Sequence, residues 1–250
     1  MWDDLVRLVP GFGWDSVLTY LRLQAFILAL PAIGERTIPA RVKISLAMAL
    51  TPLFSGLAVS PVPPVTIPEI VSSAGPEILI GLACGGLLRL MTLAIDVATS
   101  TIAATASLSQ IVGVPNEYSP HPIGNLLHLG GIAVLMALGL PVMLMQLIAD
   151  SLMLWPPGTW PGAELLVPEA ARLLARSFMF AMVLAAPFTL GGFLFQALSG
   201  VINRVMPALP VVFIGSPAAI MLALIALAIL APMILSLWAE SILSFMLPVP

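Results

Sequence analysis

Long apolar stretches recur along the whole chain and leave few charged residues to cover a folded surface. The chain is 60% hydrophobic and only 8% charged, whereas a soluble domain carries about 25% charged residues. Six stretches come close to or exceed the roughly 20 apolar residues that a membrane-spanning helix needs. They are 16–34, 44–60, 69–95, 126–150, 177–202 and 211–247. We therefore predict an all-α integral membrane protein with about six hydrophobic helical segments, in a single domain over residues 1–250.

Two regions depart from a simple series of spans. The stretch 211–247 is long enough for two passes, or for one pass and a second short helix, and Pro232 is the expected bend. Residues 96–125 begin with many Thr, Ser and Ala residues, which suit close helix packing or a wet cavity better than lipid contact. Charges also fall inside the apolar stretches, and at membrane depth they need protein or water as partners. These exceptions favour a protein that works inside an assembly.

The segment "PEILIGLACGGLLRLMTLAID" carries charges and glycines at helical spacing. Glu77, Gly81, Gly85 and Arg89 follow at intervals of four, and Asp96 lies seven residues further on. On a helix this spacing predicts one stripe, in which the two glycines let another backbone approach closely. One interpretation is a proton or ion relay built on Glu77 and Asp96. The other, which we favour, is a buried packing seam whose charges pair with each other or with neighbouring chains.

Other candidates for chemistry are sparse. His121 and His128 stand outside any metal-spaced cluster, and Cys84 lies in an apolar run where a small packing residue is expected. Motifs for nucleotide binding, nucleophilic catalysis or metalloprotease activity are missing from the sequence. The net charge of −3 does not favour nucleic acid as a partner. We expect no catalytic residue, cofactor or metal site.

The segment "NRVMPALPVVFIGSPA" interrupts two of the most apolar stretches. Pro207 and Pro210 follow Asn203 and Arg204 and stop the preceding helix from continuing. Because the apolar run resumes within a few residues, we expect a tight helical hairpin here. Its turn is too apolar for a solvated loop and is expected to pack against other protein.

Several segments together resemble the FliR family, the flagellar branch of the type III export-gate proteins. The similar segments are "IPARVKISLAMALTP", "PEILIGLACGG", "SLMLWPPG" and "INRVMPALPVVFIGSPAAI", in the family's order between about residues 20 and 220. Virulence-secretion homologues (SctT-like) share the architecture. The chain departs from the pattern at "TSTIAATASLSQIVG", where the family has a Gly- and Gln-containing stretch, and at Gly139–Leu140–Pro141, where it has a Gly–His pair.

The resemblance implies a non-enzymatic subunit of an export gate in the bacterial inner membrane, within the flagellar basal body. It implies FliP-like and FliQ-like membrane subunits and an FlhB-like subunit as partners, and unfolded flagellar proteins as cargo. Residues of about 16–150, including loop 107–123, are then FliP-like, and about 172–247 form a FliQ-like hairpin and C-terminal helix. The implied pore plug comprises Ser107, Gln110, Gly113, Pro115, Asn116 and Pro120. The implied hairpin turn at a subunit interface comprises Asn203, Arg204, Pro207, Pro210, Phe213, Gly215 and Pro217.

Two alternatives stay open from the sequence. A small proton-coupled transporter would use Glu77, Arg89 and Asp96, and an orphan membrane scaffold would have no conduit. The relay and the packing seam make different demands on Glu77. Replacing Glu77 by Gln should abolish a proton relay, but should mainly weaken assembly if the stripe is a packing seam.

Overall fold

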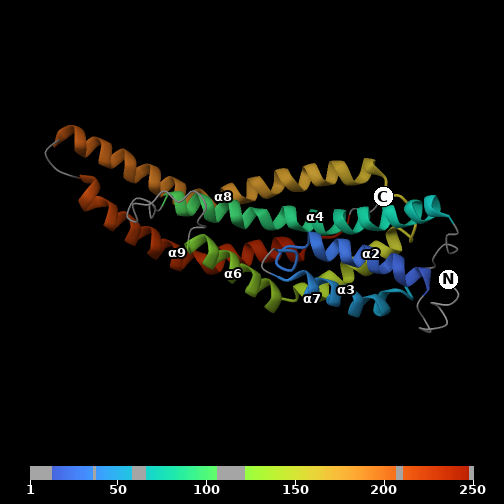
Figure 1. Cartoon of the computed structure of the whole chain (residues 1–250). Helices are drawn as coiled ribbons and strands as arrows, with labels where there is room; N and C mark the ends of the chain where they lie inside the picture. The colour runs from blue at the N-terminus through green and yellow to red at the C-terminus, as the bar shows by residue number, and fades with distance from the viewer. Residues whose placement is uncertain (1–12, 36–37, 58–65, 106–121, 207–210, 248–250) are drawn as a thin grey trace. The chain divides into compact units, whose positions relative to one another are not determined.

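All the secondary structure that the computed structural model describes is helical. The structure describes residues 13–35, 38–57, 66–105, 122–206 and 211–247 (Figure 1). Its helices are α2 (Trp14–Ala29), α3 (Ala40–Phe54), α4 (Ile67–Thr105), α6 (Pro122–Ala137), α7 (Leu140–Leu154), α8 (Ala163–Val205) and α9 (Val211–Leu243). The predicted all-α fold is confirmed, and each of the six predicted apolar stretches contains helix.

Fewer of these helices than predicted are long enough to cross a membrane. Three pass on length and apolar character, over Ile67–Ile102, Leu166–Val205 and Pro217–Leu243, and the pair α6–α7 adds a fourth if it forms one broken span. Helices α2 and α3 have 16 and 15 residues. At 1.5 Å per residue they are shorter than the roughly 30 Å hydrocarbon core. Of the six apolar stretches, 16–34 and 44–60 therefore form helices too short to cross the hydrocarbon core alone.

The stretch 126–150 forms two helices because Gly139 breaks it. Gly139 has φ +103° and its carbonyl accepts hydrogen bonds from the amides of Val142 and Met143, at 3.0 and 3.2 Å. Glycine adopts this left-handed conformation at little cost. Pro141 follows in the first turn of α7, where its missing N–H would have had no partner in the helix.

Helices α4 and α9 both continue past the points where the sequence suggested a change. Helix α4 reaches Thr105, and its hydroxyl groups find acceptors within the helix: Thr99 donates to the carbonyl of Asp96, and Ser100 and Thr101 donate to that of Val97. Helix α9 runs as one helix through Pro232, so this stretch forms neither two passes nor a separate second helix. Proline is tolerated in membrane helices where local adjustments satisfy the freed carbonyl.

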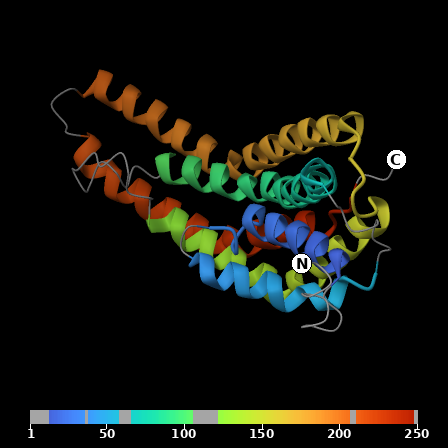
Figure 2. The same ribbon diagram turned by 45° about the vertical axis from the view of Figure 1, so that its right-hand side comes forward.

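The chain forms two compact units, each built from separate stretches of sequence. The first comprises residues 1–91, 139–174 and 244–250, and the second residues 92–138 and 175–243. In the first, α2 and α3 lie side by side (Figures 1 and 2). In the second, α6 lies along α9, and a Cβ atom on Gly131 would lie 2.8 Å from the Trp238 ring. The buried Trp238 ring therefore packs directly against the backbone at Gly131.

Candidate functional site

A buried ion pair joins α2 to α4 in the first unit. Nε of Arg22 donates to Oε2 of Glu77 at 2.8 Å, and both side chains are 0% exposed. A charge buried without a partner would be very costly, so each residue makes burial of the other possible. Glu77, predicted as the head of a charge stripe, thus has a partner on a different helix.

Arg22 also binds the end of a third helix. Nη1 donates to the carbonyl of Ser151 at 2.7 Å, and Nη2 donates to the carbonyl of Trp155 at 2.9 Å. These carbonyls lie at the C-terminus of α7, where the last backbone acceptors lack helical donors and the helix dipole favours a cation. The planar guanidinium therefore connects α2, α4 and the C-terminus of α7 through one side chain.

The second carboxylate oxygen of Glu77 holds the turn that follows α7. Oε1 accepts from the amide of Gly158 at 2.8 Å. The amide of Thr159 bonds to the carbonyl of Pro156 at 3.1 Å, with Pro157 and Gly158, at φ +81°, between them. Proline followed by a glycine of positive φ is the pattern of a type II turn. The segment "PPGT" therefore presents a backbone N–H to the buried carboxylate.

Gly81 and Gly85 let α4 lie directly against α2. A Cβ atom on Gly81 would lie 2.3 Å from the carbonyl oxygen of Arg22 and 2.8 Å from Cβ of Ala25. A Cβ atom on Gly85 would lie 2.7 Å from the carbonyl oxygen of Phe26. Such distances leave no room for any side chain, so Gly81 and Gly85 place the backbone of α4 directly against that of α2.

The predicted stripe does not continue to Arg89 and Asp96. Four residues on an α-helix turn about 400°, so the direction shifts by roughly 120° between Glu77 and Arg89. Arg89 is accordingly exposed on α4. Asp96 belongs to the second unit, where its Oδ1 lies 2.7 Å from Nδ1 of His128 on α6. The prediction of one continuous stripe was wrong for these two residues.

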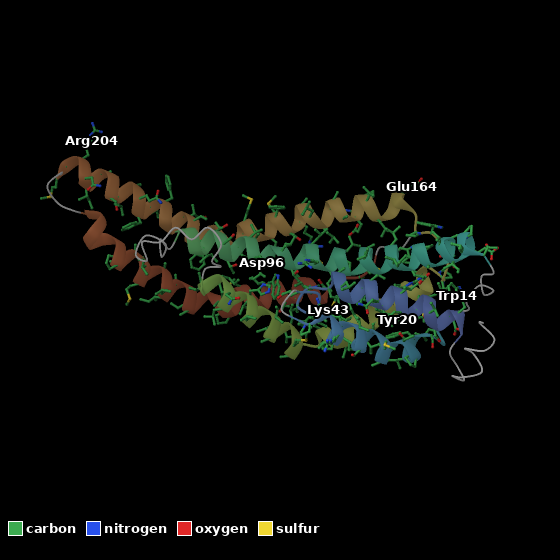
Figure 3. All side chains as sticks on the ribbon, viewed as in Figure 1. Trp14, Tyr20, Lys43, Asp96, Glu164 and Arg204 are labelled. Atoms are coloured by element: carbon green, nitrogen blue, oxygen red, sulfur yellow. The ribbon has the colours of Figure 1, made fainter. Side chains whose placement is uncertain are left out.

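Five of the seven residues predicted for the hairpin turn lie in the two flanking helices. Asn203 and Arg204 lie in the last turn of α8, and Arg204 marks its tip in Figure 3. Phe213, Gly215 and Pro217 lie in the first turns of α9. Pro207 and Pro210 fall outside the described residues. The N-terminal part of α9 is helical because its apolar residues need internally satisfied backbone groups, and Gly215 packs on the ring of Phe195 from α8.

All the predicted plug residues lie outside the described part of the chain. They are Ser107, Gln110, Gly113, Pro115, Asn116 and Pro120. His121 lies outside it too. Cys84 is buried, as its apolar surroundings suggested.

Sequence reasoning missed two interactions of buried cations. Arg22 stood out as a charge in an apolar stretch, but its pairing with Glu77 bridges 55 positions and has no local spacing. Lys43, which Figure 3 labels on α3, donates from Nζ to the carbonyls of Gly34 and Glu35, both at 2.8 Å. In the sequence, Lys43 was only one of several charges in a short segment. In the structure, the Lys43 side chain holds the connection between α2 and α3. The described residues contain no cluster of three or more side chains suited to a metal ion.

Comparison with known proteins connects this geometry to a family. Residues 14–245 match the family described as "Bacterial export proteins, family 1". The chain belongs to this family. That finding confirms the resemblance to FliR proteins drawn from the sequence segments.

Relatives named flagellar biosynthetic protein FliR align over most of their length. The one from Caulobacter vibrioides is 28% identical over 90% of this chain and 91% of the relative. Those from Aquifex aeolicus and Escherichia coli are each 27% identical and cover 87% and 86% of this chain, and 85% and 83% of the relatives. None of these names states a catalytic activity. The "PEILIGLACGG" segment of the resemblance supplies Glu77, and the "SLMLWPPG" segment supplies Ser151 and Gly158. The two segments meet because Arg22 bonds to Glu77 and Ser151, and Glu77 accepts from the amide of Gly158.

The glycine seam can be tested with three matched substitutions in α4. Gly81→Ala and Gly85→Ala should each lower the stability of the purified protein by about 1–3 kcal/mol, because the new methyl group meets the α2 backbone. Gly86→Ala meets no atom within 4 Å and should stabilise by up to about 1 kcal/mol through helix propensity. Denaturant unfolding in mild detergent measures all three. Equal effects at Gly81 and Gly86 would contradict the seam.

Proposed function

We propose that this chain is a structural and gating subunit of the flagellar type III protein export gate. With FliP-like and FliQ-like subunits it forms the pore through which unfolded flagellar proteins are exported, and an FlhB-like subunit contacts this assembly. The gate lies in the inner membrane at the flagellar basal body and is needed for flagellum assembly. The role is non-enzymatic, since the subunit supplies walls and a closure for a conduit.

The observation that supports this role most strongly is that two long apolar helices, α8 and α9, are largely unburied within the chain. The most apolar windows of α8 and α9 are only 22% and 11% buried within the chain, against 56% for α4. These two helices expose long rows of Phe, Met, Leu and Ile side chains. Such surfaces need lipid or other apolar protein. In this proposal residues of about 172–247 form a FliQ-like hairpin whose exposed faces meet neighbouring subunits, and about 16–150 form the FliP-like part.

The interfacial role of the hairpin end belongs to the same proposal. Arg204 sits at the end of α8 and is exposed. We infer that the tip from Asn203 to Pro217 packs at the entrance of the assembly. Its apolar helix ends meet other subunits there, and Arg204 finds water or an acidic neighbour.

No observation favours the alternative of a proton-coupled transporter. Both carboxylate oxygens of Glu77 are engaged, one by Arg22 and the other by the amide of Gly158. A relay group has to exchange its proton along a path, whereas Glu77 is fully buried and its nearest charged partner is Arg22, at 2.8 Å. Asp96 pairs with a histidine instead of extending a path from Glu77.

The assembly is tested by the native mass and composition of the complex purified in mild detergent from its own membranes. We expect a large complex with one copy of this chain among several copies of two small helical proteins. A membrane protein of the same host without export function, purified in parallel, controls for detergent aggregation. A stable monomer or homodimer without those partners would contradict the gate.

The plug is tested separately by deletions in the reconstituted assembly. We propose that Ser107 to Pro120 closes the pore, because the segment connects the end of α4 to the start of α6 and its Gly and Pro residues suit an irregular loop. Deleting residues 113–120 should make the assembly leak ions. Deleting residues 58–65, a stretch of equal length between α3 and α4, should leave it closed. An assembly that stays equally ion-tight after the first deletion would refute the plug.

A further inference from the structure

The segment "PPGTW" between α7 and α8 contacts α4 at two points. The amide of Gly158 donates to Oε1 of Glu77 at 2.8 Å. The Trp160 ring packs on the helix backbone at Gly75, where a Cβ atom would lie 3.2 Å from Cη2 and 3.4 Å from Cζ2 of the ring. All four residues belong to the first unit. We call this segment, residues 156–160, the strap.

The two contact points lie on opposite sides of α4. Consecutive residues of an α-helix are turned by about 100°, so Gly75 and Glu77, two positions apart, point about 160° apart. Glu77 points toward Arg22 on α2. The start of α8 lies on the other side of α4 from α2 (Figures 1 and 2). The strap therefore carries the chain across α4, from the end of α7 to the start of α8.

Hydrogen bonds and a proline limit the freedom of the strap itself. The carbonyl of Pro156 accepts from the amide of Thr159 at 3.1 Å and from its hydroxyl at 2.6 Å. The ring of Pro157 restricts its own φ angle. The residue before the strap, Trp155, is held as well, because its carbonyl accepts from Arg22. A turn restrained in this way can hold both sides of α4 at once.

The strap crosses α4 where the sequence is least suited to a helix. Gly75 and Pro76 lie inside α4, and glycine and proline are the two least favourable residues in a helix interior. Pro76 has no N–H, so the carbonyl of Ser72 lacks its usual helical donor. Helix α4 nevertheless runs unbroken through this step. Proline within a membrane helix is tolerated where neighbouring groups support the backbone.

We propose that the strap keeps α4 helical across the Gly75–Pro76 step. Its contacts at Gly75 and Glu77 flank Pro76 on both sides, and Pro76 is buried. Trp160 is the positioning residue, because one edge of its ring packs on Gly75 while the side chain as a whole is 62% exposed. The turns of α4 before Pro76 therefore depend on the strap, and those after Glu77 do not. This inference stands independently of the export role.

The strap also connects the starts of two candidate membrane spans. One span covers Ile67–Ile102 on α4, and the other covers Leu166–Val205 on α8. Helix α8 begins at Ala163, directly after the strap. Because the strap is fixed on both sides of α4, it determines where α8 begins beside α4. Loosening the strap should release the first turns of α4 and the start of α8 together.

Hydrogen exchange of the purified full-length protein in mild detergent tests the strap. Trp160→Ala should lower the protection of the α4 amides at 71–75 about five- to tenfold, since only part of the ring is buried, and should leave those at 80–91 unchanged. Met153→Ala, which removes an exposed side chain from α7, is the control and should change neither stretch. Unchanged protection at 71–75, or an equal loss in both stretches, would overturn the proposal.

A second variant assigns the effect to the weak step in α4. Pro76→Ala restores a backbone N–H and a good helix former at this position. In the Pro76→Ala protein, adding Trp160→Ala should change protection at 71–75 by less than about twofold, because the helix no longer needs the strap. A full loss in this background would contradict the proposed role of the strap. The comparison of Trp160→Ala with the natural protein decides the question if Pro76→Ala does not fold.

Discussion

The fully buried pair of Arg22 and Glu77 is the interaction on which the first unit depends. Two charges removed from water are tolerated only because almost every polar group around them is matched. Arg22 divides its donors among a carboxylate and two carbonyls, while Glu77 divides its acceptors between a guanidinium and a backbone amide. An apolar contact of the same size would be non-directional, whereas this network specifies how α2, α4, the end of α7 and the following turn are positioned.

The glycines near Glu77 and the exposed faces of α8 and α9 show where this chain places small and large residues. Small residues lie at the inner helix contact, and large apolar residues lie on the outer surface. Close backbone contact at Gly81 and Gly85 brings α2 near enough for Arg22 to reach the carboxylate. Charge and small residues are thus turned inward, while large apolar side chains are turned outward on α8 and α9. A chain built in this way has an internally completed polar centre and an outer surface suited to apolar neighbours, as expected for a member of an export family that works inside an assembly.

The sequence allowed the helical class to be predicted because composition and apolar stretch length follow directly from the membrane as a solvent. It also allowed Glu77, Gly81 and Gly85 to be read as a packing seam, since their spacing is local. The partner of Glu77 could not be predicted, because Arg22 meets it across 55 positions through tertiary packing. The stripe failed at Arg89 because an interval of four residues drifts around a helix. The division at Gly139 depended on one backbone dihedral angle that the apolar pattern conceals.

A double-mutant cycle on the purified full-length protein tests most directly whether the stability of the first unit depends on the Arg22–Glu77 pair. It compares the free energies of unfolding of Arg22→Met, Glu77→Gln and the double variant, with Glu240→Gln as an exposed control. The account predicts a loss of about 3–5 kcal/mol for each single change, a loss in the double variant well below their sum, and little effect at Glu240. A Glu77→Gln variant as stable as the natural protein, or losses that simply add, would contradict it.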